Sequence, residues 1–359
     1  MSQKHLTNHK ALLYTLCMNK IFTRLSDKKQ KLDRYQPLPD ELVKNLEEWL
    51  KVELTYSSNA IEGNTLSRIE TAEVIERGVT AVISGKPLKD QLEAINHAKA
   101  IEFIKELSKK RNGHQFITEQ DILNIHKIIL SGIQDDWAGK YRRTEVFIRG
   151  SDVQFPSPKA VPLAMKEFID WLTSRQEEHP VKIAADAHFK FVSIHPFVDC
   201  NGRTTRLLMN LILILNGYQM AVIRNEDRTT YLNSFETARK KDDMQPFYNL
   251  VYTAVERSLD IYLDVLAGKQ PDLKAFSSEG KNTVIEKSRL KIGELAKATG
   301  ETIHTLRYWT KEGLLIVAEY SSGGYQLYDK EMVGIVKKIR QLQEKERRTL
   351  TEIKKLLKA

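Results

Sequence analysis

The sequence predicts a mainly α-helical fold followed by a small domain of a different kind. Apolar residues recur at helical spacing through most of the first 266 residues, and in that part only 137–156 has strong strand character. From Ala267 on, the chain is first polar and turn-rich and then basic. We therefore expect four regions, namely an N-terminal helical region, a helical core, a linker and a small C-terminal domain, over residues 1–110, 111–266, 267–288 and 289–359.

The helical regions have recognisable starts and stops. Pro39 and Asp40 open a helix whose apolar residues keep helical spacing up to Gly63. Ser67 to Glu70 is a capping box, and the helix that follows is expected to end near Gly85. Further helices are expected over 87–110, 118–132, 159–174, 183–194, 203–215 and 229–239.

The stretch 137–156 is expected to form a β-hairpin. Two segments of strand character, 145–148 and 153–155, flank the polar residues 149–152. From the residues alone, this hairpin has either a purely structural role or a role in binding an extended peptide by strand addition.

Chemically useful residues are concentrated between His195 and Arg206. The helix 183–194 should stop at His195, because Pro196 disfavours helical backbone in the residue before it. The next helix, with Asn201 as its expected N-cap, carries Arg203 and Arg206 in its first turn. Cations at this positive end of a helix are unfavourable unless an anion binds there, so the pattern indicates a site for a di- or triphosphate.

The order His-Pro-Phe-x-Asp-x-Asn-Gly-Arg-x-x-Arg over residues 195–206 resembles the signature of the Fic (Fido) family. Members of that family transfer AMP from ATP to protein hydroxyl groups. The resemblance implies that His195 is the general base and that Asp199 binds Mg²⁺. A neutral imidazole is available at cellular pH, which suits the first role.

The resemblance also implies how the phosphates of ATP are held. Asn201 and Gly202 would line an anion hole, and Arg203 and Arg206 would bind the phosphates, with Arg206 at the terminal one. Cys200 departs from the pattern, because the family usually has a small residue there, most often glycine. We expect its backbone to approach the nucleotide only if its φ is negative and its side chain turns away.

An earlier segment matches the inhibitory pattern of the same family. Ser58, three intervening residues, Glu62 and Gly63 follow it at the end of the first helix. Glu62 lies at the negative end of that helix and lacks a cation nearby in sequence, whereas Arg206 lies at the positive end of another. We therefore expect Glu62 to pair with Arg206 and to inhibit the chain by taking the place of the γ-phosphate; a solvated glutamate at a helix end is the alternative.

Two further expectations rest on the family resemblance. The hairpin 137–156 would be the flap that holds the target peptide near the base. Tyr231 and Arg239 lie on a helical segment that in relatives is beside the adenine, so each is expected either to contact the nucleotide or to contribute to packing.

The C-terminal domain is expected to be a winged helix-turn-helix. Residues 290–300 and 302–309 form two short helices around a turn, and 320–328 two short strands around Gly-Gly. Residues 289–359 resemble MerR-type transcription regulators, and they hold fifteen Lys and Arg against nine Asp and Glu, a net +6 of the chain's +9. By analogy, the residues facing DNA would be Thr302, His304, Thr305, Arg307 and Tyr308.

Composition limits the remaining possibilities. The N-terminus has no apolar signal-peptide segment, no apolar run reaches membrane length, and the cysteines are Cys17 and Cys200. We therefore expect a cytoplasmic protein with no membrane partner. Its C-terminal domain is expected to bind DNA, to bind protein, or to position the core in a homodimer.

Two classes of function follow from these patterns. The first is an adenylyltransferase that uses ATP and Mg²⁺ to modify a Ser, Thr or Tyr hydroxyl of a target protein or of itself, or a related enzyme with another phosphate donor. The second is a DNA-binding regulator whose core only senses nucleotide. The presence of His195 favours the enzyme, because a sensor does not need a base.

Overall fold

The computed structural model describes residues 20–356, apart from 82, 149–151, 272, 274–288, 313, 316, 318, 321–325, 330, 345 and 347. The chain divides into two compact units, residues 1–277 and 278–359. Several expectations lie outside the described residues, namely those for the N-terminus with Cys17, for most of the linker, and for the turns at 149–151 and 321–325.

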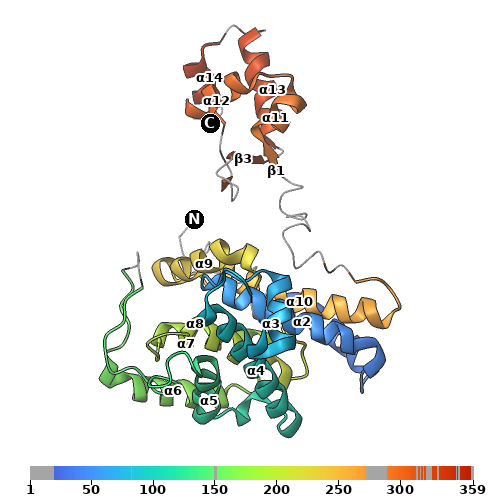
Figure 1. Cartoon of the computed structure of the whole chain (residues 1–359). Helices are drawn as coiled ribbons and strands as arrows, with labels where there is room; N and C mark the ends of the chain where they lie inside the picture. The colour runs from blue at the N-terminus through green and yellow to red at the C-terminus, as the bar shows by residue number, and fades with distance from the viewer. Residues whose placement is uncertain are drawn as a thin grey trace. The chain divides into compact units, whose positions relative to one another are not determined.

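In the first unit, all regular secondary structure among the described residues is helical, so the mainly α fold is confirmed (Figure 1). Residues 20–33 are helical. The longer helices that follow are α2 (Asp40–Ile61), α3 (Arg68–Arg77), α4 (Leu88–Lys110), α5 (Glu119–Leu130), α6 (Val161–Ser174), α7 (Pro180–Ile194), α8 (Asn201–Leu215), α9 (Arg228–Lys241) and α10 (Gln245–Leu266). Single 3₁₀ turns lie at η1 (Gly78–Thr80), η2 (His114–Phe116), η3 (Pro158–Ala160) and η4 (Asn225–Asp227).

Most helix starts agree with the sequence, and one helix end does not. The capping box at Ser67 is formed, and Thr118 caps α5 in the same way with Asp121. The helix after Ser67 was expected to reach Gly85, but α3 ends at Arg77 because Gly78 takes a left-handed φ of 61°. Residues 78–85, which begin with the 3₁₀ turn η1, therefore lie outside α3.

The centre of the first unit is α8, which is buried nearly all round. It packs against α7, α4 and α5, and α2 packs on α4. Burial on nearly every side explains why residues 207–215 are apolar except for Asn210, since such a helix has no solvent face that needs polar residues. The loop between α7 and α8 consequently joins the two helices that make the most extensive contact in the unit.

The flap segment differs from the expected hairpin. Neither 145–148 nor 153–155 forms a β-strand among the described residues. The backbone carbonyls of Thr144 and Pro156, at the two ends of the segment, accept hydrogen bonds from the guanidinium of Arg142. The Arg142 side chain thus bonds the carbonyls next to the two arms of the flap, residues 145–148 and 153–155. These arms are not paired as strands.

The second unit contains the expected helix-turn-helix and a small sheet. The helices are α11 (Ile292–Thr299), α12 (Ile303–Lys311), α13 (Glu331–Glu344) and α14 (Leu350–Leu356). The strands β1 (Arg289–Lys291), β2 (Glu319–Tyr320) and β3 (Gln326–Asp329) form an antiparallel sheet in the order β1-β3-β2. β2 and β3 are the two strands expected for the wing, and β1 was not expected. A core around Trp309, Leu306 and Tyr328 holds this unit together.

Candidate active site

The end of α7 places His195 at the start of the loop. His195 is the C-cap of α7 and has a left-handed φ of 52°, an unusual conformation for a residue with a side chain. Its Nδ1 lies 3.4 Å from the carbonyl oxygen of Val192, which makes Nδ1 the protonated nitrogen and Nε2 the acceptor. Burial, with further lowering by Arg142 and Arg239, brings the pKa of His195 to about 4. The imidazole is therefore neutral near pH 7.

Arg142 connects this histidine to the flap segment. Its side chain is fully buried and donates to the carbonyl oxygen of His195 (2.8 Å) as well as to the two flap carbonyls. The ring of Phe155, from the second arm of the flap, lies 4.3 Å from the His195 ring. Three backbone carbonyls around one guanidinium fix the base and both ends of the flap relative to one another.

Asn201 closes the loop and is the first residue of α8, so the expectation that it is the N-cap was wrong. Its side chain accepts from the amide of Phe197 (3.0 Å) and donates to the carbonyl of the same residue (2.8 Å). The N-cap position belongs to Cys200, whose carbonyl accepts the first helical hydrogen bond, from Thr204. An asparagine that bonds both backbone groups of a buried residue fastens the loop to the core.

His126 on α5 holds the same loop through a hydrogen bond to its backbone. Its Nδ1 accepts from the amide of Gly139 (3.0 Å), so Nε2 carries the proton and donates to the carbonyl of Asp199 (3.2 Å). Its ring is stacked on Phe197 at a centroid distance of 3.6 Å. The Asp199 carboxylate accepts from the amide of Cys200 (2.6 Å), which leaves its other oxygen available for a metal ion.

Cys200 also differs from expectation. Its φ is +61°, not negative, and its side chain is buried, with Sγ 2.9 Å from Nη2 of Arg203. A left-handed residue with a Cβ costs roughly 1 kcal/mol more than glycine in the same conformation. Burial raises the pKa of the Cys200 thiol to about 12, so it is a neutral thiol at physiological pH.

The structure brings the expected inhibitory residues onto Arg206. Nη2 of Arg206 donates to Oε1 of Glu62 (2.7 Å) and to the carbonyl of Ser58 (2.8 Å), and Nε donates to the Ser58 hydroxyl (2.9 Å). Gly63, with φ at 95°, is the second residue after α2 and turns the chain away. The contact occupies a buried arginine, only 2% exposed, with a carboxylate that is 38% exposed.

Gly202 lies directly against this contact. A Cβ at residue 202 would lie 2.3 Å from Oε1 of Glu62 and 3.1 Å from Nη1 of Arg206. The Glu62 carboxylate therefore lies directly against the first turn of α8, where free amides and the helix dipole attract an anion. This is the position that the sequence suggested for a phosphate.

The two expected nucleotide contacts on α9 have different surroundings. Tyr231 is buried, and its hydroxyl lies 3.3 Å from Nη1 of Arg206 and 3.0 Å from Nε2 of His188. The Arg239 guanidinium lies 5.9 Å from the ring centres of Phe189 and Phe235. Tyr231 supports Arg206 from inside the protein, and Arg239 packs over aromatic rings at the edge of the site.

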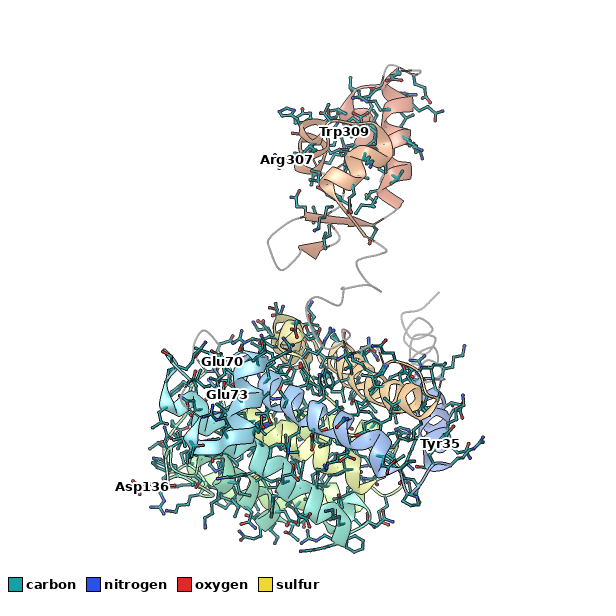
Figure 2. All side chains as sticks on the ribbon, turned by 45° about the vertical axis from the view of Figure 1, so that its right-hand side comes forward. Tyr35, Glu70, Glu73, Asp136, Arg307 and Trp309 are labelled. Atoms are coloured by element: carbon teal, nitrogen blue, oxygen red, sulfur yellow. The ribbon has the colours of Figure 1, made fainter. Side chains whose placement is uncertain are left out.

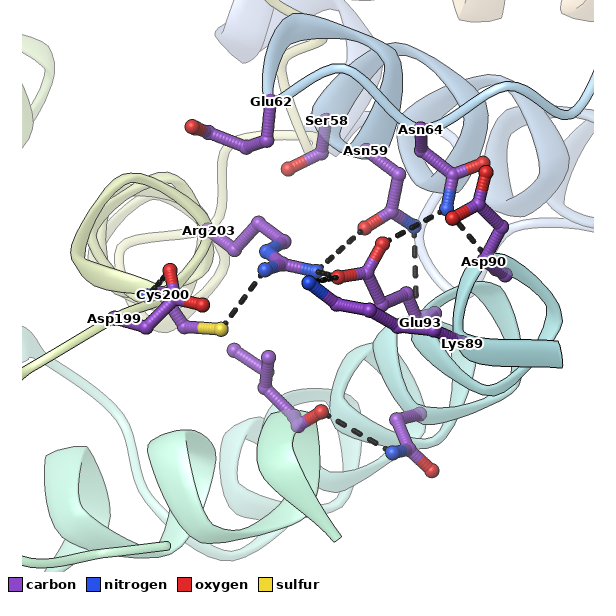
Figure 3. A network of polar contacts seen from close by, with 12 residues as sticks. Ser58, Asn59, Glu62, Asn64, Lys89, Asp90, Glu93, Asp199, Cys200 and Arg203 are labelled. Carbon is purple, nitrogen blue, oxygen red and sulfur yellow. Dashed lines mark hydrogen bonds and ion pairs between the residues drawn. The ribbon is translucent and has the colours of Figure 1, made fainter. Parts of the chain in front are cut away.

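Arg203 points to a different partner from that of Arg206. Its Nη1 lies 2.9 Å from Oε1 of Glu93 on α4, and the side chains of both residues are less than a tenth exposed (Figure 3). The same Nη1 lies 3.4 Å from the Asn59 amide oxygen. The two arginines of the motif are thus held by different carboxylates from different helices.

The residues present fit a magnesium ion held jointly with a nucleotide. Within the described part of the chain, no group of three or more His, Cys, Asp or Glu side chains could hold a metal by itself. Asp199 nevertheless offers one carboxylate beside the anion position, and Mg²⁺ in nucleotide sites usually takes one or two carboxylates together with phosphate oxygens.

In the second unit, α12 presents most of the expected DNA-facing residues to solvent. Thr302, His304, Arg307 and Tyr308 are exposed, Thr305 is half-buried, and Thr302 also caps the helix through the Thr305 amide. Arg307 and Trp309 lie two residues apart (Figure 2), the first exposed and the second in the core.

Four residues that support the site were not expected from the sequence, namely Glu93, His126, Arg142 and His188. In the sequence, His126 and His188 have no metal-ligand spacing that marks them. Their roles depend on which helices pack together, and no local pattern carries that information.

Comparisons with known proteins agree with this geometry. Residues 116–213 match the model of the Fic/DOC family, and residues 290–359 match the model described as MerR HTH family regulatory protein. The protein adenylyltransferase Fic of Culex quinquefasciatus is 35% identical over 246 residues, which are 68% of this chain and 48% of that protein. That of Nematostella vectensis is 38% identical over 210 residues, which are 58% and 48%.

The chain thus spans about half the length of the curated relatives it matches. Among solved structures, Fic-1 of C. elegans matches with a TM-score of 0.63 at 30% identity, covering 72% of this chain and 75% of that one. A Fic domain containing signaling protein of Bacteroides thetaiotaomicron matches with a TM-score of 0.61, covering 70% of this chain. Because this chain is 30% identical to the Bacteroides protein and covers 99% of it, with the motif residues assembled around one anion position, it belongs to the Fic/DOC family.

Proposed function

We propose that the chain transfers AMP from ATP to a Ser, Thr or Tyr hydroxyl of a target protein, or of itself, and that Glu62 inhibits this transfer. The observation that carries the proposal is the 2.7 Å ion pair between Glu62 and Arg206 at the first turn of α8. Because the Glu62 carboxylate binds at this position, the position can also bind the anionic phosphate of a nucleotide. The names of the relatives, protein adenylyltransferase Fic, support ATP as the donor.

In this proposal His195 is the base. Its Nδ1 is directed to the Val192 carbonyl, so Nε2 can take the proton of the target hydroxyl. The hydroxyl oxygen bonds to the α-phosphorus, the bond from that phosphorus to the bridging oxygen of pyrophosphate breaks, and AMP becomes an ester of the target. Asp199 would hold Mg²⁺, which would stabilise the charge of the departing pyrophosphate.

The remaining residues orient the phosphates. The amides at the start of α8 and the Arg206 guanidinium would attract the terminal phosphate. In this structure Arg206 is paired with Glu62, whose carboxylate lies beside Gly202. A nucleotide must displace the carboxylate or bind with its γ-phosphate misplaced. Either event reduces the fraction of bound ATP whose α-phosphorus faces the hydroxyl.

The test is the substitution Glu62→Gly. We expect incorporation of label from α-labelled ATP with Mg²⁺ into the protein itself to rise at least tenfold over wild type, because Arg206 becomes free for phosphate. Intact mass spectrometry should show the addition of AMP. His195→Ala in the same background should abolish the signal. Glu48→Gly, which changes an exposed glutamate of the same helix, controls for the effect of glycine on α2.

Two outcomes would exclude the proposal. Label from γ-labelled but not α-labelled ATP would show phosphoryl transfer, as in an enzyme of different donor chemistry. Binding of ATP by the Glu62→Gly protein without any covalent product would leave the second class, a regulator whose core only senses nucleotide.

A second candidate function, DNA binding, is favoured by the C-terminal unit. It matches the MerR HTH model, concentrates a net +6 charge in 289–359, and exposes Arg307 and Tyr308 on its second short helix. Basic residues on an exposed helix suit contacts with phosphate and base edges. A gel-shift with duplex DNA over a series of salt concentrations tests it, because phosphate contacts make affinity fall steeply with salt.

A further inference from the structure

Glu93 is a buried charged residue of the first unit that contacts both the 195–206 motif and the chain that follows Glu62. It lies on α4, outside the 195–206 motif and outside the inhibitory segment, and it is 6% exposed. Its Oε1 pairs with Arg203 Nη1 at 2.9 Å. Its Oε2 accepts from the Asn64 amide at 3.0 Å. Asn64 follows Glu62 by two residues, so one carboxylate joins the end of the inhibitory segment to the first arginine of the motif.

A second asparagine, Asn59 on α2, closes the network. The Asn59 side chain donates to the Glu93 carbonyl at 3.5 Å and accepts from Arg203 Nη1 at 3.4 Å (Figure 3). Arg203 Nη2 is directed to Cys200 Sγ at 2.9 Å. Both terminal nitrogens of Arg203 are therefore occupied inside the protein. Lys89, one turn before Glu93 on α4, lies 3.7 Å from the Glu93 carboxylate.

The two acid–arginine pairs of the site differ in how easily they can open. Glu62 is the residue directly after α2, and its side chain is 38% exposed, so water can solvate it once it leaves Arg206. Glu93 is in the second turn of a long helix, its side chain is 8% exposed, and its partner Arg203 is 4% exposed. Separating a buried pair leaves two charges that water cannot reach, which is strongly unfavourable.

We propose that Glu93 is a positioning residue that neutralises and orients Arg203 and holds the end of the inhibitory segment. It gives the two arginines different roles: Arg203 is held in the scaffold by Glu93, and Arg206 exchanges its partner between Glu62 and the nucleotide. This rests on the proposed function, because it assigns the nucleotide to the place that Glu62 occupies. In this proposal Glu93, which does not contact the phosphates, sets how much positive charge Arg203 presents to them.

Removing the charge of Glu93 should therefore strengthen the site. In the Glu62→Gly protein, Glu93→Gln removes one negative charge close to the phosphates, and we expect the Kd for ATP with Mg²⁺ to fall about fivefold. In the otherwise wild-type protein, the same change weakens the hold on Asn64 and should raise self-modification about threefold. Isothermal titration calorimetry measures the first effect, and α-labelled ATP measures the second.

The controls separate positioning from simple loss of stability. Glu93→Asp keeps the charge and should return the Kd to within about twofold of the Glu62→Gly parent. Asp121→Asn changes another buried acid, paired with Arg111 at 2.5 Å on the neighbouring helix α5, and should lower the melting temperature without tightening ATP binding. Equal or weaker ATP binding after Glu93→Gln, measured on protein shown to be folded by circular dichroism, overturns the inference.

The role of Glu93 and the proposed AMP transfer can fail independently of each other. If the Glu62→Gly protein binds ATP and forms no covalent product, the proposed transfer fails, and the Kd of the Glu93 variant still decides the role of Glu93. If transfer occurs and the Glu93→Gln change leaves the Kd unchanged, the transfer stands and the inference fails.

Discussion

At the scale of single residues, the site depends on titratable groups that burial keeps neutral. Burial lowers the pKa of His126 to about 4, and it has the same effect on His195. Each ring has one nitrogen directed to a protein carbonyl, so each tautomer is defined by its neighbours. Cys200 is likewise neutral, because burial raises its thiol pKa to about 12. Neutral His195 suits a base, and neutral His126 suits a support for Asp199.

The pH dependence of transfer should report the pKa of His195. A lowered pKa means that the neutral, proton-accepting form persists as pH falls below 6.5 and is lost only through about pH 4. For the Glu62→Gly protein, we expect kcat/KM to be flat from pH 7.5 to 5.5 and to decline towards pH 4. A pH–rate profile measures this.

That profile needs a stability control over the same range. Between pH 6.5 and 4, the unfolded chain takes up protons on histidines that the folded chain keeps neutral, so the folded state loses stability as pH falls. Circular dichroism at each pH should confirm that the protein is still folded. An activity midpoint near 6.5 with the fold intact would contradict the assignment of a buried base.

At the scale of elements, the site is a loop that is anchored from several helices. The α7–α8 loop is fastened to itself by Asn201, to α5 by His126 and to the flap by Arg142. The inhibitory helix α2 contributes Ser58 and Glu62 to the start of α8. The anion position is consequently defined by the packing of separate elements, and a change at any anchor displaces catalytic groups that it does not touch.

Arg142 should affect transfer more than nucleotide binding. Arg142→Lys keeps the charge but cannot reach three carbonyls at once, so the base and the flap lose their fixed relation. In the Glu62→Gly background, we expect kcat for self-modification to fall at least tenfold while the Kd for ATP stays within about threefold. Labelled-ATP assays and calorimetry give the two quantities.

The neighbouring residue provides the matched control for that variant. Arg143 is exposed, and Arg143→Lys makes the same chemical change one position away. Equal losses of kcat in both variants would show that general effects on this segment, and not the three carbonyl contacts, are responsible.

At the scale of the whole molecule, two units carry different chemistry. The motif, the inhibitory segment and the flap all belong to residues 1–277, and the helix-turn-helix belongs to 278–359. Each unit has its own apolar core. None of the described helices is both long enough and apolar enough to cross a lipid bilayer. Variants in one unit should therefore test its function with little direct effect on the fold of the other.

This separation gives a prediction for DNA binding by the complete chain. Arg307→Ala removes an exposed cation from α12, whereas Leu306, next to it, is buried. We expect Arg307→Ala to weaken binding of duplex DNA at least fivefold and to reduce the slope of log affinity against log salt by about one. Self-modification in the Glu62→Gly background should stay within twofold. A gel-shift that shows no loss for this variant would remove α12 from the DNA-binding surface.

The sequence by itself determined the helical class, most helix starts, the wing strands and the residues of the motif. These are encoded in local signals: apolar periodicity, capping residues, Gly and Pro at ends, and a run of twelve residues with a characteristic order. The Glu62–Arg206 pair was also predictable, because each charge lies at the unfavourable end of its own helix and the family pattern named both.

Only the tertiary structure decided what surrounds those residues. Cys200 takes a left-handed φ because the α7–α8 connection needs that turn, and Asn201 is held to Phe197 instead of capping α8. Residues 145–148 and 153–155 do not form strands, and Arg142 bonds the carbonyls of Thr144 and Pro156 beside them. Glu93 meets Arg203 because α4 packs on α8. Contacts between groups far apart in the chain depend on how helices pack, and local sequence patterns do not specify that packing.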